Sequence, residues 1–294
     1  MVKTIEAVSP GTHFFSPPNP SPAVARMAEE TTDLGPALWS ASSAGRVEEV
    51  RQLLAEEVYI DEGGGSDKTT PLHQAVAHGQ EQVTRLLLQH HADVSAQCNG
   101  GGTALHNAAH GGHATMARLL IEHQADVSSQ SHHGTTALFW AARGGHATVS
   151  RLLIEHKADA SAQDHAGGTA LHNAVGGGHE TVTRLLVEHQ ADVSAKDAEG
   201  WTALHHAAWF GHETLARLLL DTGADEQTQE DDGNTPEDLA TFAPHHQIAA
   251  MIKAEGVRRA QCVAFAMGHH ERLGVGSRVE ELDPGVVRMV LEQV

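Results

Sequence analysis

Thr70-Pro71-Leu72-His73 is the first clear copy of a four-residue motif that recurs along this chain of 294 residues. The threonine returns at positions 103, 136, 169, 202 and 235, so every step is 33 residues. The leucine and the histidine return with it, except that Phe139 replaces the histidine once and Glu237-Asp238 replaces both in the last copy. An upstream copy without the threonine begins at Leu38, 34 residues before Leu72. A constant period of this length indicates tandem structural repeats.

Each unit has the pattern of two short helices joined by a glycine turn. In the unit that starts at Thr103, the threonine is a preferred residue to begin a helix, and Gly111-Gly112 ends it. The segment 113–123 then places Met116 and Leu119 on one face of a second helix. Neither helix can bury its apolar face alone, so the units are expected to stack around a continuous core.

The period and the motif resemble those of the ankyrin repeat, whose signature is Thr-Pro-Leu-His-x-Ala. The resemblance covers residues 35–256 and implies an all-α ankyrin-repeat solenoid of stacked helix–turn–helix units with hairpin-like loops. It implies about seven repeats, including polar capping repeats at both ends. It also implies that the signature residues are structural, and that their histidines tie neighbouring repeats together through loop backbone. These residues are Thr70, His73, Thr103, His106, Thr136, Thr169, His172, Thr202 and His205.

One departure from the family lies before each Ala-Asp pair, where the chain leaves the second helix in a left-handed turn. The family favours glycine there, and Gly223 keeps it. Larger residues at this position predict a modest backbone strain in the other repeats. They are His91, Gln124, Lys157 and Gln190.

The segments on either side of the repeats differ from them in composition. Residues 1–34 are rich in proline and are predicted to be a disordered leader, followed by the array at 35–256 and a helical tail at 257–294. In the tail, a helix is expected from Val257 to Met267, with an interruption at Gly268. A last helix is expected to begin at Asp283-Pro284, because aspartate caps helices and proline suits their first turn. This helix is expected either to fold back on the array or to recruit a second protein.

The charge balance restricts the class of partner. Lys and Arg total 19 against 38 Asp and Glu, which gives a formal net charge of −19. Nucleic-acid binding needs a basic surface, so no nucleic-acid partner is expected. No run of 18 apolar residues occurs, so no membrane span is expected. The two cysteines, Cys98 and Cys262, suit a reducing compartment, and we expect the protein in the cytoplasm or the nucleus.

The sequence contains no catalytic signature. The glycine-rich stretch before Thr69 differs from a phosphate-binding loop, because Asp67 rather than glycine precedes the lysine. The 24 histidines fall mostly into three columns of 33-residue period. Stacked helices lie about 8–10 Å apart, so histidines of one column are too far apart to bind the same metal ion. Only histidines within one repeat, such as His110 and His113, could bind a metal ion together. We expect no enzymatic activity, cofactor or metal, and a loss of stability below about pH 6 as the histidines become charged.

The resemblance implies that a protein partner binds the concave face made by the first helices and the loops. Aromatic residues are only 4% of the chain, yet several fall on or beside variable positions of this face. Tryptophan and arginine dominate interface energetics. The candidate partner-binding residues are Trp140, Arg143, Asn173, Trp201, His206, Trp209 and Phe210. The alternative is that Trp209 and Phe210 fill gaps between repeats.

The expected function is therefore that of a non-catalytic interaction module or scaffold. Residues 36–243 carry a net charge of −17, which favours a partner with a basic surface, with an ordinary solvated acidic surface as the alternative. A second hypothesis is a substrate adaptor of a ubiquitin ligase, with the C-terminal helix recruiting the ligase. The identity of the partner, the oligomeric state and any use of the histidines stay open.

Overall fold

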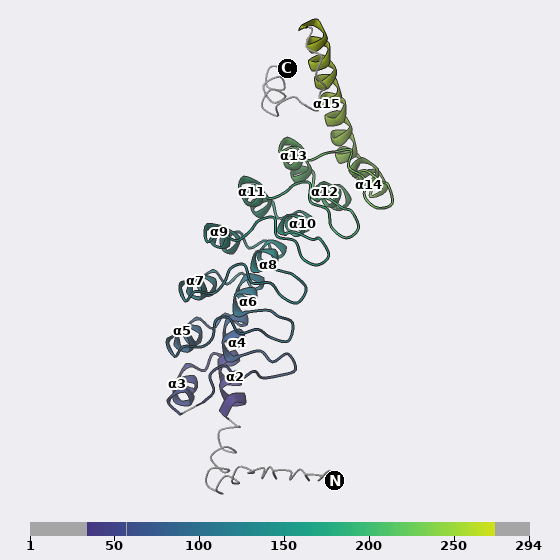
Figure 1. The fold of residues 1–294 in the computed structure, drawn as a ribbon. Coiled ribbons are helices and arrows are strands. Elements are labelled where there is room, and N and C mark those ends of the chain that lie inside the picture. Colours follow the sequence, from purple (N-terminus) through teal and green to yellow (C-terminus); the bar gives the residue numbers. More distant parts are fainter. Residues whose placement is uncertain (1–33, 57, 274–294) are drawn as a thin grey trace, which may run out of the picture.

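The computed structural model describes residues 34–56 and 58–273. Within them the chain forms fourteen α-helices and no β-strand, and two isolated β-bridges join Gly64 to Thr69 and Gln163 to Thr169. The helices are α2 (Leu34–Ala44), α3 (Val47–Ala55), α4 (Pro71–Ala77), α5 (Glu81–Gln89), α6 (Ala104–His110), α7 (Ala114–Glu122), α8 (Ala137–Arg143), α9 (Ala147–Glu155), α10 (Ala170–Gly176), α11 (Glu180–Glu188), α12 (Ala203–Phe210), α13 (Glu213–Asp221), α14 (Pro236–Phe242) and α15 (His246–Leu273). Seven consecutive pairs result, which confirms the predicted repeat solenoid (Figure 1).

The pairs stack into two layers. Each even-numbered helix from α2 to α12 contacts the even-numbered helix of the next pair, and each helix also packs on its partner within the pair. Figure 1 shows α3, α5, α7, α9, α11 and α13 along one side of the stack and the long loops along the other, beside the even-numbered helices. The surface formed by these loops and by α4, α6, α8, α10 and α12 is called the first-helix face.

Two columns of leucine form the core. One comes from the repeated motif and the other from the middle of the second helix, and every member is at most 1% exposed. They are Leu38, Leu72, Leu105, Leu138, Leu171 and Leu204, with Leu87, Leu120, Leu153, Leu186 and Leu219. Burying one such side chain contributes about 1.5–3 kcal/mol, so the 33-residue period repeats the same stabilising unit along the stack.

Where the motif keeps its histidine, it also starts the first helix by a reciprocal pair of hydrogen bonds, whereas in α8, with Phe139 in that place, only the bond to Thr136 Oγ1 is made. The Oγ1 atom of Thr70 accepts from the backbone N–H of His73 at 3.4 Å, and the backbone N–H of Thr70 donates to His73 Nδ1 at 3.2 Å. Histidine therefore takes the place that Glu or Gln has in a capping box. In the degenerate last copy Asp238 does the same, because its Oδ2 accepts from the N–H of Thr235 at 2.9 Å.

The left-handed turns after the second helices carry the strain predicted from the sequence. His91, Gln124, Lys157 and Gln190 have φ values of 64°, 69°, 70° and 62°, and Gly223 occupies the same position with a φ of 98°. For residues with a Cβ atom this region costs about 1–2 kcal/mol each.

Helix α15 corrects the expected organisation of the tail. It runs without a break from His246 to Leu273, so the expectation of a helix that begins at Val257 and is interrupted at Gly268 is wrong. The cause is tertiary: the Arg259 guanidinium donates to the carbonyls of Leu220 at 2.8 Å and Ala224 at 2.9 Å, which holds α15 on the end of α13. These bonds offset the cost of about 1 kcal/mol for a glycine within a helix.

The other expectations for the ends concern residues outside the described ranges. The predicted leader, apart from its last residue, and the helix expected to begin at Asp283-Pro284 both lie there. The division of the chain into leader, array and tail stays a prediction, and so does the ligase-recruiting role of the last helix.

Candidate partner-binding surface

Two columns of histidine link neighbouring repeats. The Nε2 atoms of His73, His106, His172 and His205 lie 3.0–3.4 Å from carbonyl oxygens of the next repeat, those of Gly102, Thr135, Trp201 and Asn234. A second column contacts the preceding repeat over the same range of distances. There, the Nε2 atoms of His113, His146, His179 and His212 lie near the carbonyls of Ala77, His110, Arg143 and Gly176.

The hydrogen bonds of the signature histidines require the neutral ring. In His106, Nδ1 must accept because its partner is the backbone N–H of Thr103, and Nε2 must donate because its partner is the carbonyl of Thr135. Burial lowers the pKa of this ring, and the backbone hydrogen bonds oppose that effect only in part. Burial is also the main cause of the lowered pKa of His73, His172 and His205.

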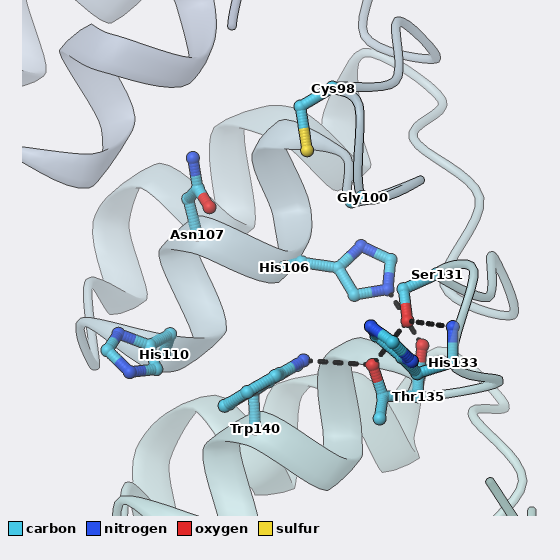
Figure 2. Close-up of a pocket in the computed structure, with 10 residues that line it drawn as sticks. Cys98, Gly100, His106, Asn107, His110, Ser131, His133, Thr135 and Trp140 are labelled. Atoms are coloured by element: carbon cyan, nitrogen blue, oxygen red, sulfur yellow. Dashed lines mark hydrogen bonds between the residues drawn. The ribbon is translucent and has the colours of Figure 1, made fainter. Parts of the chain in front are cut away.

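The first of two adjoining hollows on the first-helix face is lined by Trp140 and has a volume of about 360 Å³; we call it the tryptophan pocket. Figure 2 shows His106, His110 and Trp140 on the helices, and Ser131 and His133 on the loop side of the pocket. The other lining residues are Cys98, Gly100, Gly102, Asn107 and Thr135. The Trp140 indole N–H donates to Thr135 Oγ1 at 3.1 Å, and its ring meets His110 edge-on at 5.3 Å. No Asp, Glu, Lys or Arg lines this pocket.

The second hollow, of about 530 Å³, lies across helices α8, α10 and α12; we call it the acidic pocket. It is lined by Phe139, Arg143, Asp164, Ala166, Gly168, His172, Asn173, Gly176, Gly177, Asp197, Glu199, His206 and Phe210. Three of these residues are carboxylates and one is an arginine. The Arg143 guanidinium carbon lies 5.5 Å from the centroid of the Trp140 ring, so this cation–π contact marks the boundary between the two pockets.

Asp197 is held in place by three hydrogen bonds. Its Oδ1 atom accepts from the N–H groups of Glu199 at 3.1 Å and Trp201 at 2.9 Å, and its Oδ2 atom lies 3.0 Å from His206 Nε2. Burial alone would raise the pKa of Asp197, but the hydrogen bonds from His206 and Trp201 outweigh it, so that the pKa lies below its usual value. The loop side of the acidic pocket therefore carries a fixed negative charge at neutral pH.

An aromatic cluster adjoins the acidic pocket. Trp201 meets Trp209 at 5.8 Å and His206 at 5.2 Å between ring centroids, and His206 stacks on Phe210 at 6.2 Å. Trp209 and Phe210 remain 41% and 51% exposed. These two rings do not fill a gap in the core, since about half of each faces solvent.

The seven residues predicted from the sequence lie on one continuous part of the first-helix face. Trp140 lines the tryptophan pocket; Trp201 and Trp209 belong to the aromatic cluster and line neither pocket. The remaining four line the acidic pocket, namely Arg143, Asn173, His206 and Phe210. Trp140 is half-buried and hydrogen-bonded, whereas Phe210 is exposed. A role of these residues in binding stays a prediction.

Sequence reasoning missed the three carboxylates of the acidic pocket because it considered the helices and not the loops. Asp164 and Asp197 are 33 residues apart, and the same column reads Gly65, Cys98 and Ser131 in the earlier repeats. A comparison of loop columns would have shown the change from neutral to acidic residues.

Within residues 34–56 and 58–273, no group of three or more His, Cys, Asp or Glu side chains is arranged to hold a metal ion. His110 faces Trp140 in the tryptophan pocket, whereas His113 Nε2 lies 3.4 Å from the carbonyl of Ala77. None of the described helices combines the length and the hydropathy needed to cross a membrane.

Comparisons with known proteins agree with this architecture. A family model described as "Ankyrin repeats (3 copies)" matches residues 24–98, 91–164 and 158–230, more than half of the chain. A stretch of 75 residues is 41% identical to the Drosophila melanogaster protein named ankyrin repeat and KH domain-containing protein mask. That stretch is 25% of this chain and 2% of the length of that protein. The family match and the seven stacked helix pairs together show that the chain belongs to the ankyrin-repeat family.

Proposed function

We propose that this chain is a non-catalytic binding module that holds a basic segment of another protein on the first-helix face between α6 and α12. Ankyrin repeats are general protein-interaction modules, and the family is typically non-catalytic. What we propose for this chain is the face that binds, the residues that form it and the basic character of the partner.

The observation that carries the proposal is the exposed aromatic cluster beside the acidic pocket. Single exposed apolar residues are common on protein surfaces and need no explanation. Here Trp209 and Phe210 are exposed together, in a chain with few aromatic residues; Trp209 contacts Trp201, and Phe210 stacks on His206. Large rings next to a hollow are the residues that dominate binding energy in protein interfaces.

Charge favours a basic partner. The acidic pocket contributes three carboxylates to the first-helix face, and the repeats carry a large net negative charge. Such a field attracts a positively charged segment and speeds its association, mainly at low ionic strength. We therefore expect affinity for the partner to fall as salt is added.

The test selects binders from a random peptide library displayed on phage, with the full chain as bait. Affinities of enriched peptides are then measured by fluorescence anisotropy for the wild type and two variants. Phe210→Ala removes a ring of the proposed site and is expected to weaken binding about tenfold. Phe242→Ala is the matched control, because Phe242 is 67% exposed on α14 and lines neither pocket. The proposal fails if enriched peptides are not basic, or if both variants bind like the wild type.

A further inference from the structure

The acidic pocket owes its depth to one glycine. Gly176 ends α10 at a position where the other repeats carry Ala77, His110, Arg143 and Trp209. A Cβ atom at Gly176 would lie 3.5 Å from His206 Nδ1 and 3.8 Å from Phe210 Cε2, which are ordinary contact distances. The side chain that fills this position elsewhere is therefore missing here, and the hollow opens directly onto the imidazole and the phenyl ring.

The two sides of this hollow differ in chemistry. On the loop side stand Asp164, Asp197 and Glu199, and on the helix side stand the rings of Phe139 and Phe210. Arg143 is the single cationic side chain in the lining, and it lies over the Trp140 ring at the boundary with the tryptophan pocket. Three carboxylates and one guanidinium group line a volume of about 530 Å³.

A flat cation fits such a site best. The guanidinium group of arginine can accept an aromatic ring against its plane and donate two parallel hydrogen bonds to a carboxylate at its edge. The ammonium group of lysine has neither the plane nor the paired donors. The volume lies within the range of about 300–1,000 Å³ that is typical of ligand pockets.

We infer that the acidic pocket receives the side chain of an arginine from the partner, with Glu199 and Asp164 as its carboxylate contacts and Phe210 as its aromatic contact. The inference rests on the proposed function, since it names the anchor residue of the same binding face. Asp197 holds the loop and His206 in place, and we do not assign it as a direct contact.

Two pairs of variants test the pocket in the full chain. Gly176→Trp places in the hollow the residue that the next repeat carries at Trp209, whereas Gly176→Ala adds only the Cβ atom that the space admits. Glu199→Gln removes a charge, and Asp164→Asn does so while it keeps an oxygen for the N–H groups of Ala166 and Gly168. Circular dichroism and melting temperature establish that each variant is folded.

The probe is the tightest arginine-containing peptide from the phage selection, together with versions in which that arginine is replaced by citrulline or by lysine. Citrulline keeps the shape of arginine and lacks its charge. We expect citrulline to weaken binding about tenfold and lysine somewhat less. Gly176→Trp and the double variant D164N/E199Q are expected to cause similar losses, and Gly176→Ala almost none. With the double variant, citrulline and arginine peptides are expected to bind almost equally.

The outcomes separate the two proposals. If enriched peptides contain no arginine, or if citrulline binds as well as arginine while Phe210→Ala still weakens binding, the arginine pocket is wrong and the binding face stands. A lysine peptide that binds better than the arginine peptide also overturns the inference, because the flat cation would then not be required. If no peptide depends on Phe210, the binding face itself is wrong and the arginine pocket fails with it.

Discussion

Acidification from pH 7.5 to pH 5.5 should destabilise the array mainly through the four buried signature histidines. Each of these rings is at most 5% exposed, and burial lowers its pKa in the folded protein. The unfolded chain, with pKa values of about 6.5, then binds more protons than the folded chain as the pH falls. Stability is therefore complete above about pH 6.5 and is lost as the pH falls from there toward the folded pKa values.

The size of the effect has an upper limit. An unfolded histidine with a pKa of about 6.5 gains about 1.4 kcal/mol of proton-binding free energy between pH 7.5 and pH 5.5, and a folded histidine that stays neutral gains none. The four rings together can therefore cost at most about 5–6 kcal/mol, which is comparable to the total stability of many domains. The sequence-based expectation attributed this loss to the charging of the histidines in general, whereas for these four residues burial is the largest cause of the lowered pKa.

One variant isolates a single ring. In His106→Phe the new residue copies Phe139, which occupies the same motif position and is 8% exposed, with its N–H still bonded to Thr136 Oγ1. We expect this variant to be less stable at pH 7.5 by about 1–2 kcal/mol, because the N–H of Thr103 and the carbonyl of Thr135 lose their partner. Its loss of stability on acidification should be smaller than that of the wild type by up to about 1.4 kcal/mol.

The assay is urea unfolding followed by far-UV circular dichroism at both pH values. His123→Gln is the control, because it removes a histidine that is exposed at the end of α7 rather than buried. If the wild type and His106→Phe lose the same stability between the two pH values, the buried ring accepts a proton without cost, and the reasoning is refuted.

Three other substitutions test single features of the fold. Substitution by glycine at each strained left-handed position should stabilise the chain by about 0.5 kcal/mol, because relief of backbone strain exceeds the cost of the added chain entropy; the positions are His91, Gln124, Lys157 and Gln190. If the strain is absent, the melting temperature will not rise. Arg259→Met should lower the free energy of unfolding by about 3 kcal/mol, because Glu226 and Glu255, which are only 5% and 4% exposed, lose a cationic partner. Hydrogen exchange should become faster in α13–α15 alone, and unchanged exchange would contradict this. Ser150→Ala should leave the free energy of unfolding unchanged or raise it by up to about 1 kcal/mol, because the buried Ser150 Oγ has no hydrogen-bond partner among the described residues and Ala117 occupies the same position one repeat earlier. A loss of more than about 1 kcal/mol in urea unfolding would reveal a partner.

The sequence predicted the array well because each of its signals is local. A threonine starts the first helix of a unit, and the leucine two residues after it is buried in every copy from Leu72 to Leu204, so one correct unit fixes the others. The tail helix, which was expected to begin at Val257, was predicted wrongly because the contact that decides it is not local. Glycine at 256 and 268 indicates a break when only neighbouring residues are considered, but Arg259 bonds to residues 35 and 39 positions earlier, and no local pattern contains that contact.

The candidate site was predicted in part for the same reason. Variable positions on the first helices can be found from the period, and they led to Arg143, His206 and Phe210. The carboxylates that complete the acidic pocket come from the loops of two neighbouring repeats, and they meet the helices only after the repeats have stacked. Gly176 carries no side chain, so only the structure shows that its absence opens a hollow.

The carboxylates of the pocket are not equal as indicators of function, because the loop itself needs some of them. In this column Ser131, Asp164 and Glu230 all accept backbone N–H groups from their own loops. Wherever a hydrogen-bond acceptor occupies this position it holds its own loop, so an acidic residue there does not by itself predict a ligand.

Glu199 differs from them in this respect. The same loop position holds Gly100, His133 and Ala166 in other repeats, so the fold does not require a carboxylate there. An acidic side chain that the loop can do without therefore lines a hollow that is also lined by the exposed Phe210. If the pocket recognises a cation, Glu199→Gln should weaken peptide binding without lowering the melting temperature, whereas a purely structural role of the acidic loops would give the reverse.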